Sequence, residues 1–361
     1  MSEVAHSALQ ALLDREMQKS HTHAVLLGLE SKDGRVSFYG AAGDAHPESP
    51  YFLASITKLY TTTVINQLVD EGRLDLDALI GRYLPPEQVE GIHVYQGTDY
   101  SQYITVAQLV HQTSGLADYF EGRPSGGRSM VDDFKAGRDR AYTLDDVLAM
   151  TRALKPKFAP GAKDGTRAAY SDTNFQLLGA IIGVITGKTL AETFQTRIFN
   201  RLGLVHTYLF DHNVSREDTA PLLLYVKDQP VHVPQAMTST GPDGAIVSTT
   251  AESVRFLRAF FGGELFDAGH LLPMMAQWNT VFFPIQYGRG LMRCKLPGLL
   301  TLFQYSPELL GHSGSTGSFA FYAPKEALFL AGSFNQADSA SRPFAFMIRA
   351  INQVQKRGVM A

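Results

Sequence analysis

The placement of strand-like segments at both ends of the chain, with a long helical block between them, is the feature that most constrains the fold. Near the N-terminus, His23–Leu29 and Val36–Gly40 are predicted to be strands joined by a turn at Ser31-Lys32-Asp33-Gly34. Further strands are predicted near the C-terminus, at Tyr287–Met292, Leu299–Phe303, Ser318–Tyr322 and Ala327–Phe334. This order favours one antiparallel sheet built from both chain ends, flanked by helices, and therefore an α+β fold.

Apolar residues recur at helical spacing in the rest of the chain. Helices are expected around Leu9 to Met17, from Ser55, from Thr105 and from Thr143, and over Ser171–Gly187, Thr189–Asn200, Glu252–Phe261 and Pro343–Gln355. We expect a single domain over residues 1–361. Its sheet subdomain would span about residues 1–54 and 240–361, and its mostly helical subdomain about residues 55–239. Glu121 to Arg128, rich in Gly and Arg, is the expected mobile loop.

Charge and cysteine content exclude several classes of protein. The formal net charge is -3, and no Lys/Arg run is longer than a pair, so a nucleic-acid binder is not expected. A single cysteine, Cys294, excludes an intramolecular disulfide and a Cys-based metal cluster, and its apolar surroundings predict a buried side chain. No carboxylate cluster accompanies His21-Thr22-His23, so neither a metal site nor a cofactor is predicted.

The N-terminal segment, Met1 to Ser20, carries Glu3, Asp14, Arg15 and Glu16 on a helical pattern, without an unbroken apolar region. It therefore lacks the pattern of a secretory signal. No apolar run approaches the length of a membrane span. A cytoplasmic location is the expectation.

Ser55-Ile56-Thr57-Lys58 lies where the strand pattern gives way to a helix. Lys58 returns to the face of Ser55 three residues on and can reach its hydroxyl, and a serine needs such a base to become a nucleophile. A Ser-x-x-Lys occurs about once by chance in a chain of this length. Taken alone, it is better explained by a helix-starting serine and a solvated lysine than by a catalytic pair.

Two further segments strengthen the catalytic interpretation. Tyr170-Ser171-Asp172 falls at a loop-to-helix junction, and His312-Ser313-Gly314 ends a strand-like segment followed by small residues. Small residues there expose backbone N–H groups to a substrate. With Ser55 and Lys58, the chain has a nucleophile, two candidate bases and a proton donor in three separate segments.

These three motifs, in this order, resemble those of the serine beta-lactamase-like superfamily, which includes penicillin-recognising DD-peptidases, class C beta-lactamases, D-aminopeptidases and carboxylesterases. Four supporting stretches also match, at Leu109 to Leu116, Tyr170 to Gly179, Arg201 to Leu204 and Gly244 to Thr249. The resemblance runs from about Phe52 to Asn335 and implies a beta-lactamase/transpeptidase-like fold.

The resemblance implies roles for individual residues. Ser55 would form an acyl-enzyme, and Lys58 and Tyr170 would share the proton transfers. The positive neighbours of Tyr170 would lower its pKa below the usual value of about 10. His312 would hold Tyr170 and relay a proton to the leaving group. The oxyanion hole would consist of the backbone N–H groups of Ser55 and Ser315, and substrate contacts are expected from Asp172, Gly314, Tyr119 and Asn335.

One position departs from the usual pattern of the superfamily, and a second, His312, has the less usual of the two residues that the third motif allows. Asp172 replaces an Asn that donates to the acyl-amide group of a substrate, and an ionised carboxylate can only accept. An ester lacking that amide, or a substrate with an N–H or ammonium group, therefore fits better. The alternative is that Asp172 caps its helix or pairs with Lys58, which would favour the ammonium and leave Tyr170 as the base. His312 replaces a Lys, so weak beta-lactam hydrolysis at most is expected.

The sequence thus predicts a serine hydrolase with a small-molecule substrate, first a carboxylesterase for short or medium acyl chains. A D-aminopeptidase or DD-carboxypeptidase is the alternative within the fold, and a non-catalytic ligand-binding homologue is the alternative of another class. Gly311-His312-Ser313-Gly314-Ser315 nearly matches the elbow of α/β hydrolases, but strand rather than helix follows it, which disfavours Ser313 as the nucleophile.

Overall fold

An eight-stranded antiparallel sheet forms one half of the molecule in the computed structural model, which describes residues 3–163, 165–296, 305–338 and 341–356. The strand order is β10-β11-β12-β13-β14-β15-β1-β2. The bounds are β1 Ala24–Ser31, β2 Ser37–Gly43, β10 Asn279–Phe282, β11 Ile285–Tyr287, β12 Met292–Cys294, β13 Leu309–Ser313, β14 Ser318–Ala323 and β15 Leu328–Ser333. Because β1 pairs with both β2 and β15, the two chain ends build one sheet, which confirms the predicted fold class.

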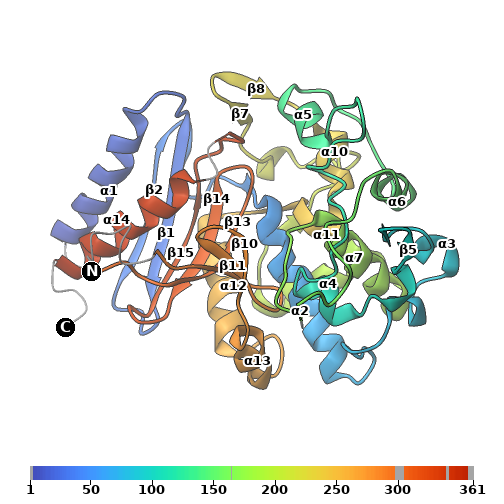
Figure 1. The fold of residues 1–361 in the computed structure, drawn as a ribbon. Helices are drawn as coiled ribbons and strands as arrows, with labels where there is room; N and C mark the ends of the chain where they lie inside the picture. The colour runs from blue at the N-terminus through green and yellow to red at the C-terminus, as the bar shows by residue number, and fades with distance from the viewer. Residues whose placement is uncertain (1–2, 164, 297–304, 339–340, 357–361) are drawn as a thin grey trace.

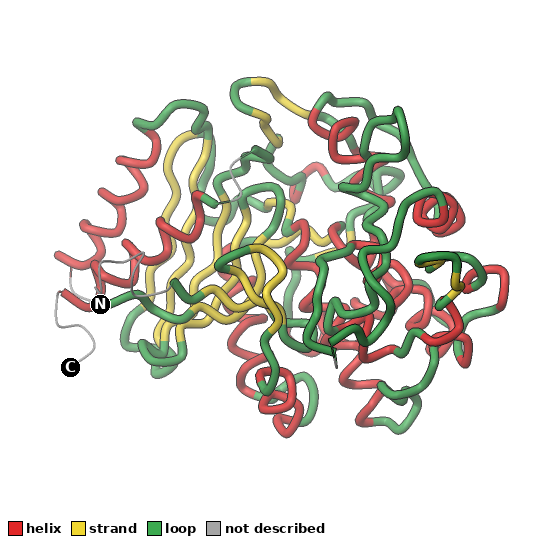
Figure 2. Tube along the Cα trace, in the orientation of Figure 1, coloured by secondary structure: helices red, strands yellow, loops and turns green. Residues whose placement is uncertain are grey.

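Helices cover both faces of this sheet. α1 (Glu3–Met17) and α14 (Arg342–Lys356) lie side by side on one face, and α12 (Thr250–Gly262) packs on the other, as Figures 1 and 2 show. Apolar side chains of α14, including Phe346 and Ile351, are fully buried against the sheet. This two-sided cover explains why β1 and β15 are buried on almost every residue.

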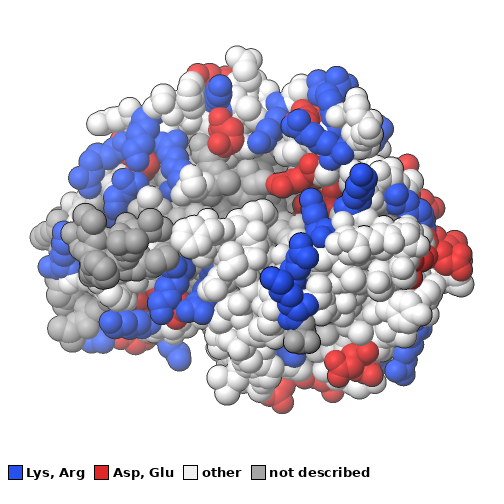
Figure 3. Space-filling view, viewed as in Figure 1, with Lys and Arg blue, Asp and Glu red and all other residues white. Residues whose placement is uncertain are grey.

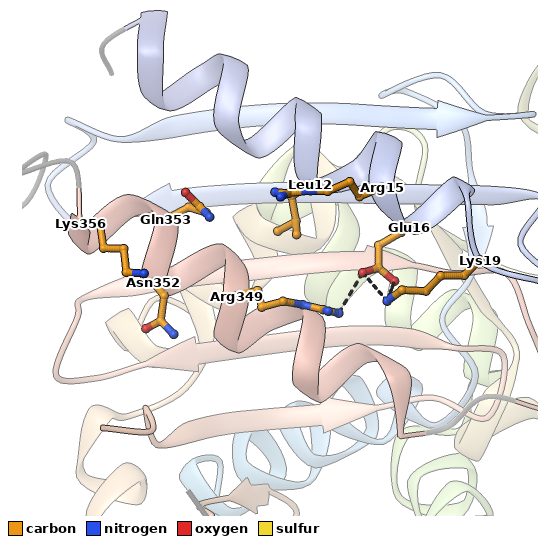
Figure 4. Close-up of a pocket in the computed structure, with 8 residues that line it drawn as sticks. All are labelled: Leu12, Arg15, Glu16, Lys19, Arg349, Asn352, Gln353 and Lys356. Carbon is orange, nitrogen blue, oxygen red and sulfur yellow. Dashed lines mark hydrogen bonds and ion pairs between the residues drawn. The ribbon is translucent and has the colours of Figure 1, made fainter. Parts of the chain in front are cut away.

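A buried carboxylate joins the two helices on the outer face. Glu16 of α1 is only 1% exposed and accepts bonds from Arg349 at 2.8 Å and Lys19 at 2.7 Å, as Figure 4 shows, with Arg342 at 3.4 Å. A small cavity of about 340 Å³ lies here between α1 and α14. Two basic side chains that line it, Lys19 and Arg349, are held on Glu16, and Arg349 thereby fixes the C-terminal helix on the N-terminal one.

The other half of the molecule is mostly helical. Its central helix is α2 (Thr57–Asp70), in which every residue from Thr57 to Leu68 is buried. α7 (Asp172–Thr186) packs beside it and ends at Gly187, which has the left-handed φ of +67° that favours glycine at a helix C-terminus. The remaining helices of this half include α4 (Val106–Val110), α5 (Met130–Lys135), α6 (Leu144–Arg152), α8 (Leu190–Phe194), α9 (Asn200–Leu202), α10 (Pro234–Ser239) and α11 (Gly241–Gly244). A three-stranded sheet, β3 (Tyr51–Phe52), β9 (Ile246–Ser248) and β6 (Tyr208–Leu209), joins the two halves.

The predicted strand Tyr287–Met292 is wrong. The chain turns there between β11 and β12, where Gly288 N–H donates to Leu291 O at 2.8 Å. Gly290 has a φ of +69°, and a Cβ at this position would lie 2.2 Å from Thr62 Oγ1, so the turn is packed directly on α2. The other strand predicted in this region, Leu299–Phe303, lies outside the described residues. The helix predicted at Thr189–Asn200 is interrupted by a π-type turn at Gln195–Phe199.

Among the described residues, no single helix has the length and apolar character needed to cross a membrane. One bent pair, Asp172–Thr186 with Leu190–Leu202 at 77°, meets that test only when both helices are taken together.

Candidate active site

Ser55 lies in a single 3-10 turn, Ala54–Ile56, that leads into α2. The preceding residue, Ala54, has a φ of +47°, a left-handed conformation that is uncommon outside glycine. Flanking bonds to β9 hold the turn: Leu53 N–H donates to Ile246 O at 2.8 Å, and Ile246 N–H donates to Thr57 Oγ1 at 3.1 Å. The small sheet therefore fixes the position of Ser55 between the two halves of the molecule.

Lys58 is fully buried one turn after Ser55 and bonds to three oxygens. Its Nζ donates to Ser55 Oγ at 3.1 Å and to the backbone oxygen of Asp243 at 2.9 Å, and it lies 2.6 Å from Asp172 Oδ1. Burial acts to lower the pKa of Lys58, but the Asp172 carboxylate, together with Asp243 in its ionised form, outweighs it, and the pKa is raised. Lys58 is therefore an ammonium in the resting site.

Gln112 positions the second motif. Its backbone oxygen accepts from Ala169 N–H at 3.0 Å, and its side-chain oxygen accepts from Ser171 N–H at 2.9 Å. These two bonds hold Tyr170 from both sides at the start of α7. The Tyr170 ring faces the ammonium, with Lys58 Nζ 5.3 Å from the ring centroid.

The Tyr170 hydroxyl is buried and has no hydrogen-bond partner of normal geometry in the described part of the chain. Burial and the Asp172 carboxylate raise its pKa well above 10, although nearby Ser55 acts to lower it. The expectation of a lowered pKa is therefore wrong for the resting site. Tyr170 is a neutral phenol there, able to donate a proton.

Asp172 is the first residue of α7 and is 8% exposed. Of the two alternatives for this residue, the structure shows the ion pair with Lys58 rather than a helix cap. The carboxylate thereby neutralises the ammonium that faces Ser55.

His312 lies on β13 and is fully buried. Its Nδ1 is 2.7 Å from the backbone oxygen of Ser313, so Nδ1 carries the proton, and Nε2 is 3.3 Å from the hydroxyl of Tyr287. Burial and the Lys58 ammonium lower the pKa of His312 to about 3. The imidazole is neutral and bonds to Tyr287 instead of Tyr170, whose ring centroid is 6.1 Å away.

The third motif lies against the Ser55 turn. A Cβ at Gly314 would lie 2.1 Å from Ser318 Oγ, 2.4 Å from Leu53 O and 3.0 Å from Ala54 Cβ, so only glycine fits this contact. The next residue, Ser315, is exposed, and within the described chain no acceptor bonds to its N–H. This places the predicted second oxyanion donor in a turn held beside Ser55.

A buried polar network lies behind Lys58. Asp243 Oδ2 accepts from the Tyr119 hydroxyl at 3.1 Å and from Gln176 Nε2 at 2.9 Å, and the Tyr119 hydroxyl lies 3.1 Å from that of Tyr142. Burial, reinforced by Asp172, raises the pKa of Asp243 to about 8. Asp243 is therefore mostly protonated at neutral pH, which limits the buried negative charge around the single ammonium.

An apolar cavity of about 710 Å³, which we call the acyl cavity, opens on Ser55. Its lining includes Tyr170, Ser313, Gly314, Ser315 and Glu121, and apolar side chains from the β10–β11 hairpin, β12 and α14: Phe282, Phe283, Pro284, Ile285, Met292, Cys294, Leu296, Phe344, Ala345 and Ile348. Phe283 is 73% exposed at the hairpin tip. Cys294 is buried as predicted, and burial raises its pKa to about 12.

Three residues predicted to contact substrate, Asp172, Tyr119 and Asn335, do not line this cavity, and Asp172 is instead held by Lys58. Tyr119 is 1% exposed and is held in the network behind Lys58. Asn335 is 2% exposed, and its amide bonds to the backbone oxygen of Leu223. Asp172 and the other predicted residues, Ser55, Lys58, Tyr170, His312, Gly314 and Ser315, are brought together from three segments.

Sequence reasoning missed Gln112, Tyr287, Asp243 and Glu121. Gln112 lies within a stretch already matched to the superfamily, so its polar side chain before the turn could have been noticed. Tyr287 and Asp243 act through burial beside Lys58, which no spacing in the sequence indicates. The described residues contain no group of three His, Cys, Asp or Glu side chains arranged to bind a metal ion.

The sheet, the helical half and the Ser-Lys-Tyr arrangement between them define a beta-lactamase/transpeptidase-like protein. The beta-lactamase family model matches residues 9–352, so the chain belongs to the beta-lactamase family of serine hydrolases.

Individual relatives agree with this family. Penicillin-binding protein 4 of Amycolatopsis lactamdurans is 28% identical over 215 residues, which cover 58% of this chain and 50% of that protein. The chain therefore spans about half the length of the curated relatives it matches.

Solved structures match over nearly the whole chain. The D-stereospecific amidohydrolase from Streptomyces sp. is 27% identical with a TM-score of 0.75, covering 98% of this chain and 99% of that one. The D-amino acid amidase from Ochrobactrum anthropi SV3, in complex with L-phenylalanine, is 21% identical with a TM-score of 0.77 and the same coverage, and at this identity it shows the fold alone.

Proposed function

We propose that the chain hydrolyses carboxylic esters of short or medium apolar acyl groups through an acyl-Ser55 intermediate. The observation that carries this proposal is the acyl cavity, which has Ser55 and the third-motif turn at one end and mostly apolar side chains beyond them. Apolar walls with a few convergent polar groups are the usual composition of a small-molecule site. Asp172 also favours an ester over an acyl-amide substrate, because it replaces the usual amide donor and its carboxylate is held by Lys58.

The proposed reaction starts from the resting site, in which Lys58 is an ammonium and Tyr170 a neutral phenol. Ser55 Oγ attacks the carbonyl carbon, and its proton passes to the coupled pair of Lys58 and Tyr170 once that pair has lost one proton to solvent. The N–H groups of Ser55 and Ser315 would hold the oxyanion, and such donors are worth about 3 kcal/mol each. The ester C–O bond then breaks, the leaving alkoxide takes a proton from Tyr170, and water releases the acyl group from Ser55.

The first test is covalent labelling of the nucleophile with a fluorophosphonate probe, followed by intact mass and peptide mapping. One adduct per chain on Ser55 is expected, with labelling lost in Ser55→Ala and retained in Ser313→Ala. An adduct on Ser313 would overturn the assignment. No adduct on any serine would favour a ligand-binding homologue without turnover.

Acyl selectivity tests the cavity itself. Ala345 is exposed on α14 and lines the acyl cavity, so Ala345→Trp adds bulk there with little risk to the fold. We expect this variant to move the preference among 4-nitrophenyl esters toward shorter acyl chains. Ala251→Trp, at an exposed position of α12, is the matched control and should leave the preference unchanged. Equal profiles for both variants would place the acyl group elsewhere.

A second candidate is the hydrolysis of amides of apolar D-amino acids. Glu121 lines the acyl cavity beside Ser55 and Tyr170, where a carboxylate suits a substrate ammonium group, and the 27% identical structure is a D-stereospecific amidohydrolase. Under this proposal, D-phenylalanine amide would be cleaved in preference to its L-enantiomer, and Glu121→Gln would raise KM for the amide. Turnover of the esters alone would leave the first proposal standing.

A further inference from the structure

A second cavity, of about 640 Å³, adjoins the acyl cavity and shares Glu121, Tyr170 and Phe282 with it. Its other wall carries charged groups, among them Lys155 and Lys157. We call it the charged cavity. The two cavities therefore meet at Tyr170, the proposed proton donor to the leaving group.

The charges in this cavity do not cancel. Burial and the Asp172 carboxylate raise the pKa of Asp118 well above its usual value and so favour its neutral form. Glu121 also lines this cavity; burial and Asp172 raise its pKa as well, while the charges of Lys135, Lys58 and Lys157 oppose that shift. Arg123 is paired with Asp132 at 2.9 Å. Within the described residues, neither Lys155 nor Lys157 has an ion-pair partner. In the face shown in Figure 3, Lys and Arg side chains lie among Asp and Glu side chains over the helical half.

The two lysines belong to an ordered segment. Lys157 N–H donates to Gly115 O at 2.8 Å, two residues before Ala117, whose backbone oxygen accepts from the hydroxyl of Ser171, the neighbour of Tyr170, at 3.1 Å. Pro156 separates the two lysines and restricts the backbone between them. The side chains are exposed, so their ammonium groups are hydrated cations at the rim of the cavity.

The position of the nucleophile decides which part of a substrate each cavity receives. Ser55 and Ser315, which would hold the acyl carbon and its oxyanion, line the acyl cavity and not the charged one. The acyl group therefore stays in the acyl cavity, and the leaving group departs past Tyr170, where the charged cavity begins.

The third motif does not provide an alternative anchor for an anion. His312 is neutral and bonded to Tyr287, and Arg349, which also lines the acyl cavity, is paired with Glu16 at 2.8 Å. Among the described residues that line the charged cavity, Lys155 and Lys157 are thus the cations without an ion-pair partner, and they are available to a group leaving past Tyr170.

We propose that the charged cavity is the leaving-group site and that Lys155 and Lys157 make it selective for leaving groups that carry a carboxylate, such as a hydroxy acid or an amino acid. This inference rests on the proposed acyl-Ser55 function and extends it. The bond between the acyl carbon and the leaving oxygen or nitrogen breaks, the leaving atom takes a proton from Tyr170, and the carboxylate remains ionised between the two ammonium groups.

A pair of esters with the same acyl group tests the selectivity. The substrates are the butanoyl esters of 4-nitrophenol and of 5-hydroxy-2-nitrobenzoic acid, which differ by one carboxylate on the leaving group. The measured quantity is kcat/KM for the carboxylate ester divided by kcat/KM for the neutral ester, because a general loss of activity cancels in this ratio. Fluorophosphonate labelling of Ser55 checks that each variant retains a working nucleophile.

The double variant Lys155→Glu/Lys157→Glu is expected to lower the ratio by about tenfold, and Lys155→Arg/Lys157→Arg should retain it. Added salt should lower the wild-type ratio, because exposed charges are screened. The control is Lys188→Glu. Lys188 is an exposed lysine just beyond the C-terminal end of α7, and at 1.5 Å per residue it lies about 24 Å from Asp172 at the other end of that helix. This variant should leave the ratio unchanged.

A ratio that stays within about twofold in the Glu variant, with normal Ser55 labelling, would overturn the leaving-group proposal and leave the esterase proposal intact. If the wild-type chain hydrolyses neither ester and Ser55 is not labelled, the proposed function fails and the leaving-group proposal fails with it.

Discussion

Lys58 Nζ lies 2.6 Å from Asp172 Oδ1, closer than the 3.1 Å that separates it from Ser55 Oγ. The carboxylate therefore competes with the nucleophile for the ammonium and favours its charged form. Asp172, two positions after Tyr170, thus acts on Lys58. It determines the pH at which the proposed base becomes available.

Asp172→Asn should shift the acid limb of the kcat/KM profile to lower pH. In the wild-type chain Asp172 helps to raise the pKa of Lys58, so the deprotonated pair forms only at alkaline pH. Without that anion, burial acts on the ammonium with less opposition, the pKa falls, and a larger fraction of the pair is deprotonated at neutral pH. Ester hydrolysis at the optimum should remain within about tenfold, and turnover of acyl-amide substrates should improve.

The measurement is kcat/KM from pH 5 to 10 for a 4-nitrophenyl ester and an acyl-amide substrate. Asp77→Asn, an exposed acid-to-amide change, is the control and should leave the profile unchanged. An unmoved acid limb, or an equal loss on both substrates, would contradict the assigned role of Asp172.

The pH profile also separates His312 from the proton-transfer groups. Because burial and Lys58 lower the pKa of His312 to about 3, the imidazole does not titrate between pH 5.5 and 7.5, and no inflection is expected there. His312→Asn keeps an N–H donor near the backbone oxygen of Ser313, so it should change the height of the profile, within about tenfold, and not its shape. A wild-type inflection near pH 6.5 that is lost in this variant would show that His312 transfers protons.

The three motifs were predictable from the sequence because their chemistry depends on residue type and short spacing. Ser55 and Lys58 lie one helical turn apart, and Tyr170 and Asp172 lie at a recognisable loop-to-helix junction. The antiparallel sheet was predictable for a similar reason, since the hairpin of β1 and β2 has a local turn signature.

The environment of those motifs was not predictable, because it depends on residues far apart in the chain. The raised pKa of Tyr170 comes from burial, with Phe282 and Tyr287 packed against its ring from a hairpin more than a hundred residues away. Tyr119 and Glu121 are two residues apart, yet only Glu121 reaches the acyl cavity. Local sequence does not determine which of two neighbouring side chains faces a cavity.

Gly314→Ala should reduce kcat/KM by about a hundredfold or more while the protein remains folded. A Cβ at this position would lie 2.4 Å from Leu53 O and 3.0 Å from Ala54 Cβ, so the third-motif turn must move away from the Ser55 turn. Gly183→Ala is the matched control, because a Cβ there, inside α7, meets only Lys188 O at 4.0 Å. Normal activity in Gly314→Ala would mean that the spacing of these two turns does not position the oxyanion donors.

Glu16→Ala should destabilise the protein without changing the chemistry of the site. Its carboxylate is 1% exposed and accepts from Arg349 and Lys19, with Arg342 only 14% exposed beside it. Removing the anion leaves the Arg342 guanidinium partly buried without its partner, and breaking such a pair costs about 3 kcal/mol. Urea unfolding should therefore show a lower midpoint with little change in slope, because the surface exposed on unfolding is nearly the same.

The control for this variant is Asp14→Ala, an exposed acidic residue on the same helix, which should leave the unfolding midpoint nearly unchanged. For Glu16→Ala itself, kcat/KM in the absence of urea should stay near the wild-type value, since the cluster lies on the outer face of the sheet. α14 also contributes Phe344, Ala345 and Ile348 to the acyl cavity. An altered acyl-chain preference at unchanged stability would therefore mean that Glu16 sets the position of α14 in the cavity and contributes little to the free energy of unfolding.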